Sequence, residues 1–278
     1  EALSLNHRVV GFDINPLSCL ITEAKIALNS MNRNSMNNLF QELKKLDLPI
    51  SIILEEVYET KVLKYLRLWF NEEDLEDLVA LRCQIEALPV KTRTVGLAIL
   101  SDIINPISYQ KESEQRPKKD VRDYIVGETL RLFISKIEKM SERMESTISP
   151  QNFTPDSEIY NVTYLESSRV IDDSSVDIIV TSPPYFTAMP YLIADRLNLF
   201  VLGMGGKSEV MKEIGMIGSR EVTSREASKL WSEYQKNKQI LPDSVQDLIE
   251  LTSANFHGGK EGIGQRRKVQ PELLYRYF

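Results

Sequence analysis

The sequence predicts an α/β fold in which a large helical insertion interrupts a parallel sheet, and three observations support this. Residues 8–13 have the pattern of a strand that leads directly into a helix. Residues 178–180 are an apolar β-branched run, which is typical of a buried parallel strand. Residues 35–146 have apolar side chains at helical spacing almost throughout. A simple crossover between parallel strands needs only about a dozen residues, so this middle stretch is predicted to be a subdomain.

The composition limits the chemistry and the compartment. The net charge of −6 provides no overall basic field, so a nucleic-acid partner would have to be held by local patches. Cys19 and Cys83 are far apart and form no CxxC pair, so neither a disulfide framework nor a zinc site is expected. His7 and His257 are the only histidines, which makes histidine-based catalysis an unlikely basis for function. With no signal peptide and no apolar run near the roughly 20 residues of a membrane span, a cytoplasmic protein is expected.

The first predicted element is the strand of residues 8–13, which ends in Asp13. Asn15 can cap the helix that follows, and Pro16 suits its first position. The apolar residues of this helix recur at helical spacing: Leu17, Leu20, Ile21, Ala24 and Leu28. Because the chain opens directly on this β–loop–α unit and stops at Phe278 within a helical pattern, it is expected to be incomplete at both ends.

The second part of the chain returns to sheet character. Residues 159–165 are predicted to form a strand closed by Glu166, and residues 178–180 form the next strand. The segment Ser182-Pro183-Pro184-Tyr185 follows at once. Its prolines donate no backbone hydrogen bond, and the first one biases Ser182 away from helical geometry. The chain therefore leaves the sheet as a stiff loop at the carboxyl end of a strand, where open α/β sheets bind ligands. Such a loop suits a flat ligand that carries an amino group.

The rest of the chain is predicted to be helical with loops. Residues 191–202 form an apolar helix closed by Gly203, and helices are expected at 224–238 and 244–251. A glycine-rich basic loop spans residues 257–268. Within the insertion, the helix that starts near residue 95 is expected to end before Pro106.

The segment Ser182-Pro183-Pro184-Tyr185, preceded by Val-Asp-Ile-Ile-Val-Thr, resembles the catalytic motif of the S-adenosylmethionine-dependent amino-methyltransferases that act on DNA. These enzymes carry [DNS]-P-P-[YFW] at this point. The continuation in residues 185–188, Tyr191 and residues 196–203 is similar to theirs as well. The alternative is a proline turn that ends a strand, and the matching residues on both sides favour the catalytic interpretation.

The resemblance implies methylation of the exocyclic amino group of cytosine or adenine. The lone pair of that nitrogen is delocalised into the ring, and two acceptors on its hydrogens would localise it toward the methyl donor. The Ser182 side chain and the Pro183 carbonyl are the expected acceptors, with Pro184 holding the loop stiff. Tyr185 is expected to stack on the flipped base, which contributes about 1–3 kcal/mol in comparable sites. Methyl transfer is then a direct displacement governed by alignment. Serine in the first position favours N4 of cytosine over N6 of adenine.

The same resemblance implies a site for S-adenosyl-L-methionine. Residues 11–16 resemble the second-strand segment, in which the acid at the strand end takes the ribose hydroxyls, and Asp13 is that acid here. Glu166 occupies the place of an acid near the adenine amino group. Relatives often have Gly-Asp where this chain has Leu165-Glu166, so an exposed structural glutamate is the alternative. The family's F-x-G-x-G cofactor loop would precede Arg8 and is absent from this sequence, so the chain by itself is expected to be inactive.

The family resemblance implies a truncated class I methyltransferase core, a Rossmann-like three-layer α/β/α fold. Four segments are predicted: residues 1–30 begin the core, 31–150 form the helical insertion, 151–205 are the catalytic part, and 206–278 are a truncated helical segment that is a candidate for DNA contact.

The expected partners are DNA and a restriction or defence-system protein. The basic loops at residues 111–119 and 260–268 could contact phosphates, although solvated loops explain them equally well. An RNA guanine-N2 methyltransferase is the nearest alternative function. A truncated, non-catalytic remnant that acts as a binding module is the alternative from another class.

Overall fold

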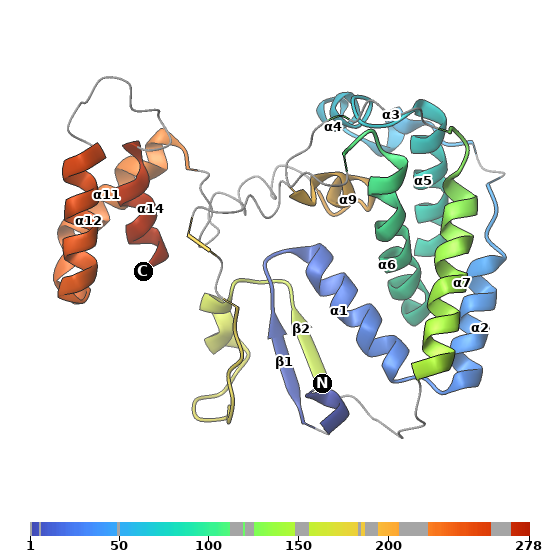
Figure 1. Ribbon diagram of the computed structural model, residues 1–278, viewed down its shortest axis with the longest axis horizontal. Helices are drawn as coiled ribbons and strands as arrows, with labels where there is room; N and C mark the ends of the chain where they lie inside the picture. Colours follow the sequence, from blue (N-terminus) through green and yellow to red (C-terminus); the bar gives the residue numbers. More distant parts are fainter. Residues whose placement is uncertain are drawn as a thin grey trace. The chain divides into compact units, whose positions relative to one another are not determined.

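The computed structural model shows a mostly helical protein with a small two-stranded parallel sheet (Figure 1). The residues that it describes are 2–5, 7–48, 51–111, 119, 125–147, 156–182, 185–186, 194–205, 222–256 and 268–278. They belong to two compact units. The first unit comprises Glu1–Ser175 and Asp195–Gly206, and the second unit comprises Val176–Ala194 and Lys207–Phe278. None of the helices in the described part of the chain is long and apolar enough to cross a membrane.

The sheet consists of β1 (Val9–Phe12) and β2 (Ser157–Tyr160), which pair in parallel (Figure 1). The register places Phe12 opposite Tyr160, and their rings stack with centroids 5.6 Å apart and planes inclined by 18°. The predicted first strand is thus confirmed. The helical insertion leaves the sheet after β1 and returns to its neighbouring strand.

The predicted second strand is shorter than expected. It ends at Tyr160, and Tyr164–Arg169 form a 3₁₀ helix, η2, so Glu166 lies in a helical turn rather than at a strand end. The strand gives way to a turn at Asn161. The side-chain amide of this residue donates hydrogen bonds to the carbonyls of Asp13 and Ile14, which follow β1. Asparagine favours turns for this reason.

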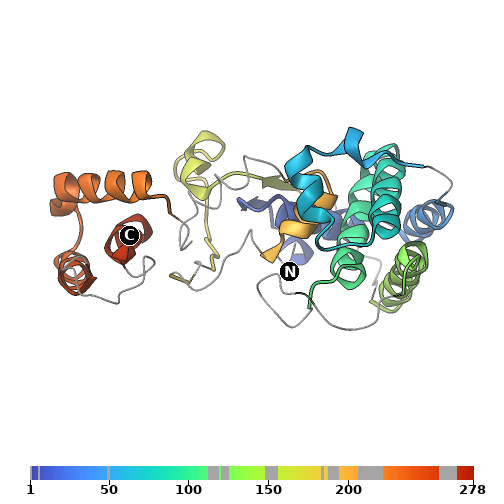
Figure 2. The same cartoon turned by 90° about the horizontal axis from the view of Figure 1, so that it is seen from above.

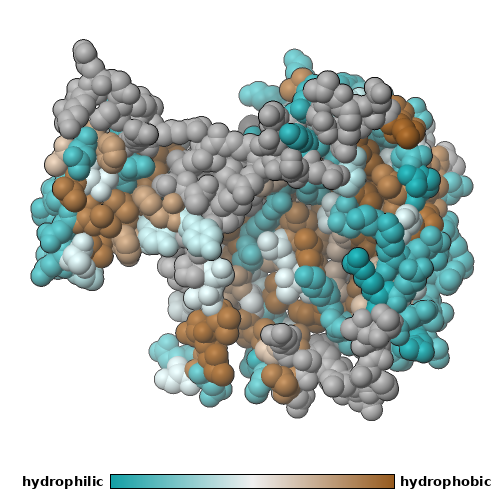
Figure 3. Space-filling view, in the orientation of Figure 1, coloured by the Kyte–Doolittle hydropathy of each residue, from teal (hydrophilic) through white to brown (hydrophobic). Residues whose placement is uncertain are grey.

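The prediction of a buried strand at residues 178–180 is wrong for the structure as described. These residues form no strand, and the side chains of Ile178, Ile179 and Val180 are 77%, 83% and 92% exposed. A parallel strand is buried only where other strands and helices cover it, and the described sheet consists of β1 and β2 alone. Figure 3 shows apolar side chains at the surface of the segment that Figure 1 colours olive to yellow.

The helices of the first unit enclose its core. They are η1 (Leu3–Leu5), α1 (Pro16–Asn29), α2 (Arg33–Lys44), α3 (Leu54–Val57), α4 (Thr60–Leu66), α5 (Glu72–Glu86), α6 (Val90–Ile107), α7 (Thr129–Thr147) and α9 (Arg196–Val201). Helix α1 contacts both β2 and α6, and so joins the sheet to the helical layer (Figures 1 and 2). Helices α5, α6 and α7 pack on one another and supply the buried side chains Leu75, Leu78, Leu81, Ile85, Ile99, Leu100, Ile103, Phe133 and Ile137.

Local sequence signals explain several helix ends. Asn15 caps α1 by accepting a hydrogen bond from the Leu17 N–H at 3.0 Å, and Pro16 occupies the first turn, as predicted. Asn71 caps α5 in the same way. The expected end before Pro106 is wrong, because α6 continues through it to Ile107. Pro106 removes one hydrogen bond from the last turn, and the helix ends one residue later.

The second unit is built from α11 (Ser224–Asn237), η3 (Lys238–Ile240), α12 (Asp243–Phe256) and α14 (Gln270–Tyr277). The helix predicted at 224–238 is confirmed, and the one predicted at 244–251 is longer than expected. Three side chains form the buried centre of this unit: Tyr234, Ile249 and Leu274. The hydroxyl of Tyr234 donates to Glu250 at 2.9 Å, so this buried ring keeps a polar partner.

Ionisation of Asp77 in the first unit lowers the stability of the folded state. Asp77 lies on α5, and burial is the largest cause that raises its pKa to about 6. The negative charges of Asp74, Glu73 and Glu76 add to this increase. Because the pKa in the unfolded chain is about 3.9, the folded state loses stability as the pH rises from about 4 through 6.

We predict that Asp77→Asn stabilises the protein in a pH-dependent manner. The variant cannot ionise at this position, so its free energy of unfolding should match that of the wild type near pH 4 and exceed it increasingly up to pH 7.5. The gain should not exceed about 1 kcal/mol, because solvent screens this partly exposed group. Urea unfolding at pH 4.5, 6 and 7.5 would measure it. A difference that stays constant over this range would contradict the assignment.

Candidate functional site

The carboxyl ends of β1 and β2 lie at the same edge of the sheet and carry a group of polar residues. Asp13 directly follows β1, and its backbone N–H donates to the Tyr160 carbonyl at 3.1 Å, which extends the strand pairing by one bond. Asn161 directly follows β2, although it is 148 residues away from Asp13 in the sequence. In parallel α/β sheets this edge is where ligands bind.

Asp13 presents an exposed carboxylate on a fixed turn. Its Oδ1 accepts the backbone N–H of Asn15 at 2.8 Å, which is the side-chain-to-backbone bond of an Asx turn. Asn15 itself is buried, and its Oδ1 caps α1 through the Leu17 N–H. The direction of the Asp13 carboxylate is therefore tied to the start of α1.

The backbone of this turn is held from two further sides. The amide of Asn161 donates to the carbonyls of Asp13 at 3.0 Å and Ile14 at 3.1 Å. The buried Cys19 thiol donates to the Asp13 carbonyl at 3.5 Å, and burial, followed by the nearby Asp13 charge, raises the pKa of Cys19. The carbonyls at the end of β1 are thus satisfied by side chains of α1 and of the β2 turn.

A second acid belongs to this site. The Asn15 amide donates to Asp195 Oδ2 at 2.7 Å. Burial is the main cause that raises the pKa of Asp195; the bond from Asn15 lowers it, and the charge of Asp13 raises it. Asp195 and Asn161 were not predicted as site residues. Asn161 could have been noticed as a turn former directly after a strand, but no local signal joins Asp195 to a residue 180 positions earlier.

Asp195 directly precedes α9, and glycine ends that helix as predicted. Gly203 has a φ of +70°, its N–H donates to the Phe200 carbonyl at 3.1 Å, and Met204 donates to the Leu199 carbonyl at 2.7 Å. These two bonds and the left-handed glycine form a Schellman motif. A Cβ atom at Gly203 would lie 3.0 Å from a guanidinium nitrogen of Arg82, so both the backbone and the neighbour favour glycine.

We predict that Gly203→Ala lowers the free energy of unfolding by roughly 1–3 kcal/mol, because a left-handed alanine is strained and its Cβ would press on Arg82. Gly127→Ala is the matched control, since Gly127 also has a positive φ of +81° but its Cβ would meet nothing closer than 3.5 Å. Chemical unfolding should give the larger loss for Gly203→Ala. An equal or smaller loss would mean that the contact with Arg82 imposes no constraint.

The structure does not join Glu166 to this group. Its carboxylate forms an ion pair with Arg169 one turn away in η2. In the described part of the chain, no hydrogen bond or ion pair links Glu166 to the Asp13 turn. A role for Glu166 beside a cofactor stays a prediction.

The predicted base-binding loop belongs to the second unit, and the structure describes only part of it. Ser182 is exposed and Tyr185 is 74% exposed, whereas Pro183 and Pro184 lie outside the described residues. The next residue, Phe186, packs against the core of this unit and meets the Tyr277 ring edge to face at 5.7 Å. The two consecutive aromatic residues therefore differ: one contributes to the core and the other presents most of its surface to solvent.

The predicted phosphate contacts fall mostly outside the described residues. Of the two basic loops, the structure describes Lys111, Lys119 and Lys268. The Lys119 ammonium lies 5.8 Å from the centre of the Tyr109 ring. Phosphate binding by these loops stays a prediction.

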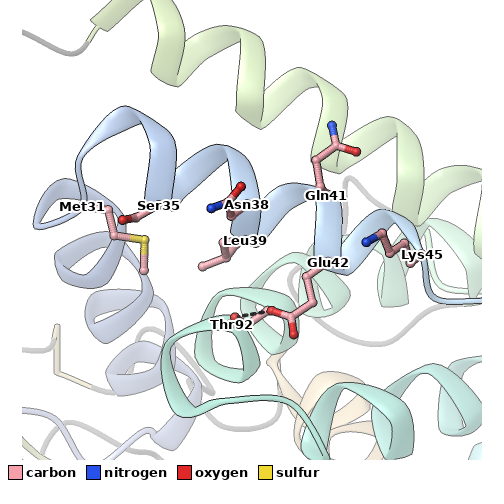
Figure 4. Close-up of a pocket in the computed structure, with 8 residues that line it drawn as sticks. All are labelled: Met31, Ser35, Asn38, Leu39, Gln41, Glu42, Lys45 and Thr92. Carbon is pink, nitrogen blue, oxygen red and sulfur yellow. Dashed lines mark hydrogen bonds between the residues drawn. The ribbon is translucent and has the colours of Figure 1, made fainter.

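A separate groove of about 570 Å³ lies between α2 and α6 (Figure 4). It is lined by Met31, Ser35, Asn38, Leu39, Gln41, Glu42, Lys45 and Thr92. Thr92 donates a hydrogen bond to Glu42 at 2.9 Å, and no predicted site residue lines the groove. Among the residues with described positions, no cluster of three or more histidine, cysteine, aspartate or glutamate side chains could hold a metal ion.

The chemical capacity of the strand edge is that of a polar binding site. It offers one exposed carboxylate on a rigid turn, backed by a half-buried carboxylate and two amide side chains. This set can accept hydrogen bonds from hydroxyl or amino groups of a ligand. No family model, no curated protein and no solved structure matches this chain.

Proposed function

We propose that the chain is part of an S-adenosylmethionine-dependent DNA amino-methyltransferase with a class I methyltransferase core. It transfers a methyl group to an exocyclic amino group of a flipped base, N4 of cytosine in preference to N6 of adenine. The observation that carries the proposal is the pairing of β1 with β2, which places the exposed acid Asp13 at the carboxyl edge of a parallel sheet.

The strand pairing supports a cofactor site of the doubly wound kind. In such sheets the second and third strands are neighbours, and an acid at the end of the second takes the ribose hydroxyls. β1 and β2 are neighbours despite the long insertion between them. Asp13 has the matching position, and its carboxylate is held in one direction by the Asn15 N–H. In this proposal Glu166 approaches the adenine amino group of S-adenosyl-L-methionine.

The state of the motif residues supports a base-binding role for the loop. Tyr185 presents most of its ring to solvent, as a stacking platform must before the base arrives. Phe186 is held against the second unit next to it. In the proposed reaction Ser182 and the Pro183 carbonyl accept the hydrogens of the target amino group, and Pro184 restricts the loop.

A second candidate is favoured by a different observation. Among the described residues, no strand lies beside the exposed apolar side chains of Ile178, Ile179 and Val180, as a non-catalytic remnant that binds a partner would show. RNA guanine-N2 methylation is the alternative within the same chemistry, and the serine before Pro-Pro favours DNA. We place the enzyme in the cytoplasm, within a restriction-modification or defence system.

Two observations would decide between the enzyme and the remnant. Sequencing of modified bases in DNA from cells that express the gene should show N4-methylcytosine or N6-methyladenine at a defined site. The coding sequence upstream of Glu1 should encode a strand followed by a glycine-rich loop. A stop codon there, together with unmodified DNA, would favour the remnant.

We predict that Asp13→Ala weakens binding of S-adenosyl-L-methionine roughly 10- to 100-fold, because the ribose hydroxyls lose a charged acceptor. Calorimetry on the protein encoded by the complete gene would measure it. Asp156→Ala is the matched control: this acid flanks the opposite end of β2, where it pairs with Arg8 at 3.6 Å. If both variants bound the cofactor like the wild type, Asp13 would be only a turn residue.

We predict that Tyr185→Ala reduces DNA methylation at least about 10-fold and leaves the affinity for S-adenosyl-L-methionine unchanged. The variant loses the stacking surface for the flipped base, which is worth about 1–3 kcal/mol. Methyl transfer to a duplex oligonucleotide and calorimetry together would test this. Phe278→Ala removes another exposed aromatic side chain of the second unit and serves as the control. Methylation at the wild-type rate in Tyr185→Ala would refute the role of the loop.

A further inference from the structure

Helix α9 is fixed to the rest of the first unit at both of its ends. At the N-terminal end, Asp195 accepts the hydrogen bond from the Asn15 amide at 2.7 Å. At the C-terminal end, the Val201 carbonyl accepts a hydrogen bond from the Arg82 guanidinium at 2.9 Å and a longer one from the Tyr58 hydroxyl at 3.4 Å. The helix is short, so contacts at its ends decide where it lies.

Arg82 suits this place for electrostatic reasons. It is buried, its guanidinium lies 5.9 Å from the centre of the Tyr58 ring, and Glu86 pairs with it at 3.6 Å. The carbonyls at the C-terminal end of a helix carry partial negative charge. A buried cation that bonds one of these carbonyls therefore holds α9 against α5 of the helical insertion.

Aromatic contacts support the same placement. The Arg196 guanidinium lies 5.8 Å from the centre of the Tyr65 ring, and Tyr65 meets the Phe200 ring edge to face at 5.6 Å. Tyr65 belongs to α4. Arg196 and Phe200 are one turn apart, so the single face of α9 that carries them packs on Tyr65 of the helical insertion.

The oxygen and the nitrogen of the Asn15 side-chain amide make different hydrogen bonds. Its oxygen must face the Leu17 N–H to cap α1, and its NH₂ group must then face an acceptor. A carboxylate only accepts, so Asp195 favours this orientation and disfavours the flipped one. The main-chain N–H of the same Asn15 holds the Asp13 carboxylate.

We infer that Asp195 is a positioning residue that acts on Asp13 through Asn15. The carboxylate of Asp195 locks the Asn15 side chain, and the locked Asn15 backbone aims the Asp13 carboxylate at its ligand. The helical insertion takes part because α9, which is preceded by Asp195, packs on α4 and α6 and accepts a hydrogen bond from Arg82 of α5. The functional meaning rests on the proposed function, in which Asp13 binds the cofactor ribose.

Two variants of Asp195 separate positioning from general stability. Asp195→Ala removes the acceptor, whereas Asp195→Asn keeps an oxygen that accepts the Asn15 amide. Asp102→Ala is the matched control, because Asp102 forms an exposed ion pair with Lys136 of α7 and has no hydrogen bond to the Asp13 turn among the described residues. Amide hydrogen exchange of Asn15 and Leu17 reports on the turn without any ligand. Calorimetry and turnover assays on the protein encoded by the complete gene report on the binding of S-adenosyl-L-methionine.

Asp195→Ala should increase exchange of the Asn15 and Leu17 amides at least about 5-fold and weaken cofactor affinity about 5- to 10-fold, the size expected for one lost hydrogen bond. In turnover assays the KM for the cofactor should rise in proportion while kcat stays unchanged. Asp195→Asn should restore both quantities to within about 3-fold of the wild type, and Asp102→Ala should alter neither.

Unchanged amide exchange in Asp195→Ala, or an Asp195→Asn variant as impaired as Asp195→Ala, would overturn the inference. If the wild-type protein binds no S-adenosyl-L-methionine but the amide exchange responds as stated, the proposed function fails and the positioning of the Asp13 turn by Asp195 stands. The two failures are therefore distinguishable.

Discussion

The parallel pairing of β1 with β2 is the constraint on which the first unit depends. It joins segments separated by the whole helical insertion and brings Asp13 and Asn161 to one edge. Because both strands run in the same direction, the insertion must leave at this edge and return to the opposite one. Helix α1 makes the first crossing step and packs on β2 and α6. The helical layer and the polar edge are consequences of the same pairing.

At that edge the need to satisfy backbone groups and the capacity to bind a ligand use the same residues. The carbonyl that follows β1 would be an unpaired acceptor where the ladder stops. Asn161 and Cys19 supply its donors, and Asn15 closes both the Asp13 turn and the start of α1. A turn fixed in this way cannot rotate its carboxylate freely, which lowers the ordering cost of binding a ligand.

Local signals predicted much of the fold, because the forces that they reflect act within a few residues. The first strand, the cap at Asn15 and the helix end at Gly203 all follow from such signals. The burial of residues 178–180 does not, because it depends on which strands lie beside them. The contact between Asp195 and Asn15 was not predicted for the same reason, because it depends on where α9 packs. The roles of Asp13 and of the Ser182–Tyr185 loop, which were inferred from a local pattern and a family resemblance together, stay predictions.

The two candidate functions predict different coverings for the exposed run at Ile178–Val180. Burying a valine or isoleucine side chain contributes about 1.5–3 kcal/mol, so three such residues give a strong tendency to acquire a covering strand. In the enzyme, a strand on either side of this run would set the direction in which the following loop leaves the sheet, and hence where Tyr185 meets the base. In a binding module, the same run would pair with a partner chain, as exposed strand-forming segments tend to do. In both candidate functions, the element that covers this run would set the direction in which the loop carrying Tyr185 leaves it.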